Sequence, residues 1–227
     1  SPHCVRSRRR DGHRDLYRIA RVLDGVVEQV GHNRPELLGI TADDQCAVAW
    51  RIELDGARME VMPKDRQADT FVGQRTDVDR AADLLSAIKF SNAGQVCVSP
   101  NRFYVHEKVY ERFLARFIER TKKIKVGPGL APDTSMGPLA HERRVPAMVE
   151  FVEDAAARGG EIALGGTRLG DRGYFFAPTV IANPPDDSKV MTLEPFGPIA
   201  PCVPFSDLGD AIRRANSLPY GLSSYAF

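Results

Sequence analysis

Residues 89–107 read KFSNAGQVCVSPNRFYVHE and connect a predicted helix to a predicted strand. Before this stretch, residues 77–88 place apolar side chains every three or four positions, the spacing of a helix with one buried face. After it, residues 102–106 are predicted to form a short strand. A second helix begins near Glu107, and its apolar face carries Val109, Tyr110, Phe113, Leu114, Phe117 and Ile118. The stretch therefore predicts a helix–strand–helix unit.

The same alternation continues toward the C-terminus. The predicted elements are a turn-rich loop at 126–138, a helix that ends at Gly159-Gly160, strands at 161–166 and 173–181, a helix at 208–216 and a final apolar segment at 221–227. Strands that alternate with helices of this length are typical of βαβ units. The sequence therefore predicts an α/β fold with a largely parallel sheet.

The N-terminal third gives a weaker signal. Residues 1–14 are basic and aperiodic and are predicted to be a mobile tail, with a nucleic-acid-binding arm as the minor alternative. Apolar residues at helical spacing predict a helix from Asp15, and a short second helix is predicted over 35–40. Residues 41–76 show no sustained period. We interpret 15–76 as N-terminal helices, followed by a main domain over 77–227.

Composition narrows the class of protein. The 227 residues carry 31 Lys and Arg against 30 Asp and Glu, and the formal net charge of +1 argues against a general nucleic-acid binder. No apolar stretch is long enough for a membrane span, and the opening residues do not resemble a secretory signal. The cysteines at positions 4, 46, 97 and 202 are far apart, which predicts free thiols in a reducing cytoplasm and no metal site.

Cys97 has the most suggestive surroundings of the four cysteines. It follows a predicted helix in a stretch of small residues, where Gly94 allows two backbones to approach closely. A lone cysteine at such a junction is more often a packed thiol. The reactive alternative needs an exposed thiolate, stabilised by backbone N–H groups or by a nearby positive charge. The residues by themselves leave both interpretations open.

Residues 77–227 resemble the catalytic domain of the aldehyde dehydrogenase superfamily. The stretch around Cys97 is similar to the family's segment around its nucleophilic cysteine. Four later segments match further landmarks in the same order: VGPGLAPDTSMGPL, FFAPTVI, LEPFGPIAP and AIRRANSLPYGLSSYAF. The residues GQVCVSPNR are nearest to the succinate-semialdehyde and broad-aldehyde branches of the family.

The resemblance implies oxidation of a small aldehyde to an acid, with NAD or NADP as the hydride acceptor. Cys97 is then the nucleophile that forms a thiohemiacetal, and its amide N–H is one donor to the oxyanion. Glu194 matches the carboxylate that holds the nicotinamide ribose, and Phe196 matches the aromatic residue beside that half of the cofactor. The resemblance also implies a homo-oligomer, and it implies no metal.

The sequence departs from the family before Cys97. The family's PWN-type segment, its lysine for the adenosine ribose and its Gly-rich turns near the pyrophosphate cannot be found upstream of Thr76. In place of the ELGG motif with the general base, the chain offers only Glu53-Leu54-Asp55-Gly56. We therefore interpret 15–76 as a remnant of the cofactor domain, most of which has been deleted at a point between about residues 60 and 76. We do not assign Glu53 as the general base. The family's oligomerisation arm would follow residue 227, so we also expect a truncated C-terminus.

These departures leave three functions open. The first is aldehyde oxidation through Cys97, impaired in the isolated chain because each lost charge-assisted cofactor contact is worth about 1.5–3 kcal/mol. The second is hydrolysis of activated esters through an acyl-Cys97, which needs no cofactor. The third is an inactive remnant or interaction fragment, whose uncovered apolar helix faces would promote association.

Overall fold

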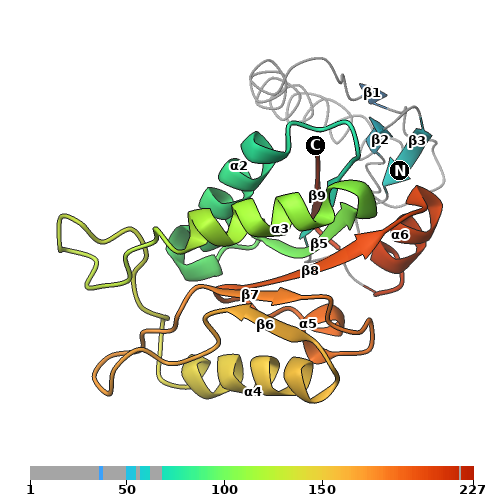
Figure 1. Ribbon diagram of the computed structural model, residues 1–227. Coiled ribbons are helices and arrows are strands. Elements are labelled where there is room, and N and C mark those ends of the chain that lie inside the picture. Colours follow the sequence, from blue (N-terminus) through green and yellow to red (C-terminus); the bar gives the residue numbers. More distant parts are fainter. Residues whose placement is uncertain (1–35, 38–49, 55–56, 62–67, 220) are drawn as a thin grey trace, which may run out of the picture.

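The computed structural model describes residues 36–37, 50–54, 57–61, 68–219 and 221–227. Most of them form one six-stranded sheet with helices packed against it (Figure 1). Its strands, in spatial order, are β6 (Glu161–Leu164), β7 (Thr179–Ala182), β8 (Ile199–Phe205), β5 (Pro100–His106), β4 (Ala68–Val72) and β9 (Ser223–Ala226). β6 runs antiparallel to β7, and every other neighbouring pair is parallel. The predicted α/β fold with a largely parallel sheet is confirmed.

The helices lie between these strands along the chain. They are α2 (Val78–Phe90), α3 (Glu107–Thr121), α4 (Arg144–Ala157), α5 (Lys189–Thr192) and α6 (Leu208–Ala215). α2 and α3 lie side by side over β5, whereas α4 lies beside β6 (Figure 1). Phe117 of α3 is the centre of an aromatic cluster, with ring centroids 5.3 Å from Phe103 and 5.4 Å from Phe113. None of the described helices is long and apolar enough to cross a membrane.

The observed α2 begins where its sequence predicts. The Asp77 carboxylate accepts a hydrogen bond from the amide of Arg80 at 3.1 Å, which satisfies one of the donors left open at a helix start. The predicted apolar face is buried at Val78 and Leu85, but Ile88 is only half-buried. Lys89 lies on the buried side instead and is 0% exposed. The last turn of α2 therefore carries a charge into the core.

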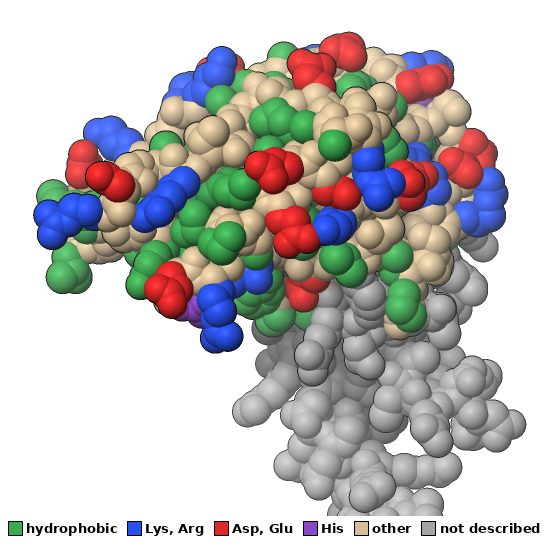
Figure 2. All heavy atoms as spheres, turned by 90° about the horizontal axis from the view of Figure 1, so that it is seen from below, with side chains coloured by type: hydrophobic (Ala, Val, Ile, Leu, Met, Phe, Trp, Pro, Cys, Tyr) green, Lys and Arg blue, Asp and Glu red, His purple; other side chains and the backbone are tan. Residues whose placement is uncertain are grey.

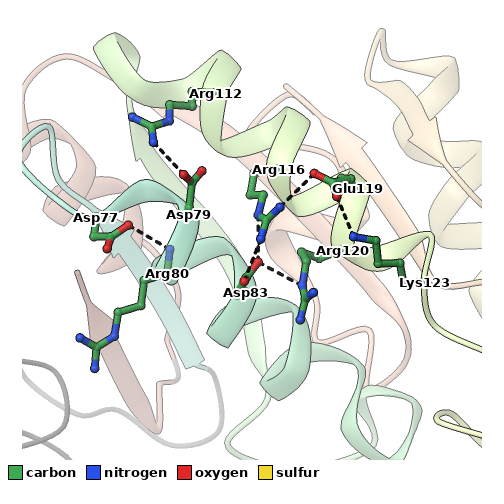
Figure 3. A network of polar contacts seen from close by, with 9 residues as sticks. All are labelled: Asp77, Asp79, Arg80, Asp83, Arg112, Arg116, Glu119, Arg120 and Lys123. Atoms are coloured by element: carbon green, nitrogen blue, oxygen red, sulfur yellow. Dashed lines mark hydrogen bonds and ion pairs between the residues drawn. The ribbon is translucent and has the colours of Figure 1, made fainter.

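The surface carries charges of both signs. On the face shown in Figure 2, acidic and basic side chains are interspersed among apolar ones. Figure 3 shows a network that joins α2 to α3, in which Arg112 pairs with Asp79 at 2.8 Å and Arg116 pairs with Asp83 at 3.0 Å. Exposed pairs of this kind contribute only about 0.2–1 kcal/mol each. They supplement the packing of Phe90 of α2 against Phe117 of α3, whose ring centroids are 6.0 Å apart.

The short helix predicted over 35–40 is wrong where the structure describes it, whereas the interpretation of 15–76 as a remnant of a cofactor domain stays a prediction. Glu36–Leu37 form β1 rather than part of a helix, and they pair with β2 (Trp50–Leu54), which pairs in turn with β3 (Ala57–Val61). β4 joins the main sheet, so the boundary expected at residue 77 falls after a strand of that sheet. The expected tail over 1–14 and the helix from Asp15 lie outside the described residues.

β4 was missed because its sequence, ADTFV, places a charge in a buried strand. The Asp69 carboxylate is paired with Arg102 of β5, through Nε to Oδ1 at 2.7 Å and Nη2 to Oδ2 at 2.6 Å. Arg102 Nη2 also donates to the carbonyl of Ala215 at 2.8 Å, at the end of α6. This buried contact joins β4, β5 and α6, and it explains how an aspartate can occupy a central strand.

Candidate functional site

Cys97 lies in a tight turn between α2 and β5. The amide of Ser99 donates to the carbonyl of Val96 at 2.9 Å, so Cys97 and Val98 are the two central residues of a β-turn. Cys97 is exposed, and Val98 is 40% exposed. Cys202 in β8 is 0% exposed, and burial raises the pKa of its thiol. Of the two cysteines that the structure describes, only Cys97 is exposed to solvent.

The backbone before Cys97 is strained. Asn92, Ala93 and Gly94 have φ values of 48°, 54° and 69°, and the first two are not glycine. The Asn92 side chain supports this conformation by donating from Nδ2 to the carbonyl of Gln95 at 3.1 Å. Consecutive left-handed residues are uncommon and cluster at functional sites. The strained backbone therefore marks this loop as a candidate functional site, independently of its cysteine.

Gly94 brings the Cys97 loop against a second loop, residues 194–198. A Cβ on Gly94 would lie 2.2 Å from the carbonyl oxygen of Gly197, so only glycine fits at this contact. The two loops precede β5 and β8, which are parallel neighbours. Both loops therefore lie at the amino ends of these strands, opposite to the carboxyl edge where ligands of open α/β sheets usually bind.

Gln95 ties the Cys97 loop to a third segment, residues 138–140. Its side-chain oxygen accepts a hydrogen bond from the amide of Ala140 at 2.8 Å, and its Nε2 donates to the carbonyl of Asn92 at 3.2 Å. Three segments that are far apart in the sequence thus meet around one turn. They are the segments predicted to be landmarks around Cys97, after residue 126 and around Glu194.

The loop at 194–198 presents the other two candidate residues. Glu194 is half-buried, while Phe196 is 38% exposed and adopts a φ of 42°. Arg144 of α4 holds the loop backbone by donating from Nη2 to the carbonyls of Pro195 and Phe196. Burial lowers the pKa of Arg144, and the negative charge of Glu194 opposes this shift. The structure therefore places Cys97, Glu194 and Phe196 on two loops in direct contact.

A buried lysine lies beneath these loops. Lys89 Nζ has no hydrogen-bond partner within the described part of the chain. Burial lowers the pKa of Lys89 to about 7, opposed by the negative charge of Glu194. The Lys89 carbonyl accepts a hydrogen bond from Ser99 Oγ at 3.3 Å. Sequence reasoning missed this residue, because nothing local distinguishes it from a lysine that ends a helix at the surface.

Other candidate features are absent or lie elsewhere. Glu53 falls in β2, and its side chain lies outside the described part of the structure. The described residues contain no cluster of histidine, cysteine and acidic side chains that could hold a metal ion. A hollow of about 360 Å³ is lined by residues 126–128, 169–172 and Phe175, none of which belongs to the loops around Cys97.

Comparisons with known proteins all point to aldehyde dehydrogenases. Residues 67–227 match the model of the "Aldehyde dehydrogenase family". The mitochondrial succinate-semialdehyde dehydrogenase of Oryza sativa subsp. japonica is 42% identical over 160 residues, which are 70% of this chain and 30% of that protein.

Two crystal structures are similar over 72% of this chain. The succinate-semialdehyde dehydrogenase of Burkholderia pseudomallei matches with 36% identity, a TM-score of 0.70 and 34% of its chain covered. The 1-pyrroline-5-carboxylate dehydrogenase from Thermus, crystallised with bound NAD, matches with 28% identity, a TM-score of 0.68 and 31% of its chain covered. The chain thus spans about a third of the length of the proteins it matches.

Proposed function

Because the chain belongs to the aldehyde dehydrogenase family, we propose that it carries the thiol-bearing part of an aldehyde-oxidising site, with Cys97 as the nucleophile. One observation carries the proposal: the exposed Cys97 lies in a turn directly after three left-handed residues, and the last of these, Gly94, packs against the loop with Glu194 and Phe196. A packed structural thiol, such as Cys202, has neither feature. The arrangement therefore favours the reactive interpretation of Cys97.

The proposed chemistry starts with the thiolate of Cys97. Its sulfur bonds to the carbonyl carbon of the aldehyde, and the electron pair of the C=O bond moves to the oxygen. The amide N–H of Cys97 has no backbone acceptor among residues 68–219 and 221–227, so it can donate to that oxygen. The result is a thiohemiacetal held at the surface of the turn.

The residues of the loop at 194–198 fit the nicotinamide half of NAD or NADP. The Glu194 carboxylate can accept hydrogen bonds from ribose hydroxyls, and the exposed Phe196 ring offers an apolar surface beside them. When bound, this cofactor supplies the acceptor for the hydride that leaves the thiohemiacetal carbon. Arg144 keeps the loop in place through its hydrogen bonds to the backbone.

The similar proteins differ in the substrate that their names specify, which is succinate semialdehyde for one and 1-pyrroline-5-carboxylate for another. For this chain we propose a small aldehyde as the substrate class. A cytoplasmic location, a homo-oligomeric assembly and the lack of a nucleic-acid partner remain predictions. The mixture of acidic and basic side chains in Figure 2 favours the last of these over a basic binding face.

We expect the chain to release a burst of nitrophenol from p-nitrophenyl acetate, because acylation needs only the thiolate and the oxyanion donor. Stopped-flow absorbance measures the burst, and peptide mass mapping should find the acetyl group on Cys97. Cys97→Ser should abolish the burst, whereas Cys202→Ala should retain it because the Cys202 sulfur is buried. No burst, or acetylation confined to Cys4 or Cys46, would remove Cys97 as the nucleophile.

Formation of NADH or NADPH from a panel of small aldehydes then separates the two chemistries. Cofactor reduction that Cys97→Ser abolishes would support the full oxidation. A burst without cofactor reduction would restrict the described chain to acyl-thiol chemistry.

A further inference from the structure

The hydroxyl of Tyr225 contacts the Cys97 turn from the far end of the chain. Tyr225 lies on β9, where it pairs with Thr70 of β4. Its Oη donates to the carbonyl of Val98 at 2.7 Å, across a separation of 127 residues. Val98 is the residue directly after Cys97 and the second central residue of the turn. This hydrogen bond therefore joins the C-terminal strand to the turn that presents the thiol.

The other contacts of the turn hold its two ends. Gln95 fixes the entry through Ala140, and Ser99 fixes the exit through the carbonyl of Lys89. Between them, Cys97 and Val98 are exposed. Within the described residues, the hydrogen bond from Tyr225 is the one side-chain hydrogen bond made to these two central residues, Cys97 and Val98. Without it, the peptide between Val98 and Ser99 can rotate more freely.

We propose that Tyr225 is a positioning residue for Cys97: by holding the Val98 carbonyl, it fixes the turn in the orientation that presents both the sulfur and the amide N–H of Cys97. This inference rests on the proposed role of Cys97 as nucleophile. Burial raises the pKa of Tyr225. The phenol consequently keeps its proton and remains a donor at neutral pH.

Tyr225→Phe tests the role because it removes the hydroxyl and keeps the ring. The matched control is Tyr110→Phe, since the Tyr110 hydroxyl donates to a backbone carbonyl at 3.0 Å in the same way, but to Cys202 inside the core. Two measurements are made on the full chain. The first is hydrogen–deuterium exchange of the Ser99 amide, and the second is the rate of Cys97 acylation compared with its alkylation by iodoacetamide.

We expect Tyr225→Phe to speed exchange at Ser99 and to slow acylation, each by about tenfold, the factor that corresponds to one hydrogen bond. Alkylation should change little, because it needs the thiolate but no oriented oxyanion donor. Tyr110→Phe should leave all three values at the turn unchanged. Equal losses in acylation and alkylation, or an unchanged exchange rate at Ser99, would overturn the positioning role.

The two proposals can fail separately. If the unaltered chain shows no acylation of Cys97, the proposed function fails, and the exchange at Ser99 still decides whether Tyr225 holds the turn. If acylation occurs and Tyr225→Phe changes neither acylation nor exchange, the proposed function stands and the role of Tyr225 falls.

Discussion

Arg102→Met is expected to lower the free energy of unfolding by about 3–5 kcal/mol, the usual cost of removing one partner from a buried ion pair. Arg102 is 2% exposed, and both oxygens of the Asp69 carboxylate accept hydrogen bonds from it. Burial raises the pKa of Asp69, and Arg102 opposes this shift. Without the guanidinium, the buried Asp69 carboxyl group would either stay charged without a partner or take up a proton at a cost, and the carbonyl of Ala215 would lose its donor.

Urea denaturation followed by circular dichroism measures this loss. The matched control is Arg112→Met, because Arg112 makes the same type of pair with Asp79 but its side chain is 66% exposed. That substitution should cost about 0.2–1 kcal/mol. A double variant, Asp69→Leu with Arg102→Met, should recover part of the loss, because no unpaired charge remains in the core. If Arg102→Met costs no more than Arg112→Met, the Asp69–Arg102 contact does not hold the sheet together.

The helices could be predicted from the sequence because their signals are local. α2, α3, α4 and α6 each show apolar residues at helical spacing, and each is observed within a few residues of its predicted bounds. β4 and β8 could not be predicted in this way. Asp69 interrupts the apolar run of β4, and Pro201 and Pro204 remove backbone donors from β8. Both strands are buried because of partners that are distant in the sequence.

In the candidate site too, local motifs could be predicted from the sequence, whereas contacts between distant segments could not. The identities of Cys97, Glu194 and Phe196 came from motifs, which contain no distances. The contact between Gly94 and Gly197, the bridge from Gln95 to Ala140 and the hydrogen bond from Tyr225 to Val98 join segments that only the fold brings together. No local pattern distinguishes Tyr225 from a tyrosine that merely fills an edge strand. These contacts had to be read from the structure.

Lys89→Met is expected to stabilise the fold at pH 6 by about 1–4 kcal/mol, as replacement of a buried charge by an apolar side chain often does. Lys89 is 0% exposed, and its Nζ has no hydrogen-bond partner within the described residues. Methionine is similar in length and can fill the same space. The gain should appear in denaturant unfolding, with Lys123→Met as the control, because Lys123 is a lysine with a 58% exposed side chain just after the end of α3.

The pH dependence identifies the cause of this gain. Burial lowers the pKa of Lys89 from 10.5 to about 7, so between these values the unfolded chain binds a proton that the folded chain does not. The stability contributed by this group therefore rises with pH across that window, by about 1.4 kcal/mol per pH unit at most, and is constant below it. The advantage of Lys89→Met should be largest below pH 7 and shrink toward pH 9.

The effect of Lys123→Met on the free energy of unfolding should not change with pH between 6 and 9. An advantage of Lys89→Met that stays constant from pH 6 to pH 9 would mean that packing, rather than charge, causes it. If the advantage shrinks as expected, the fold carries a buried ammonium at a cost in stability, close enough to Glu194 for the two charges to interact. A cost of this kind next to a proposed cofactor contact is typical of a site where charge serves function rather than folding.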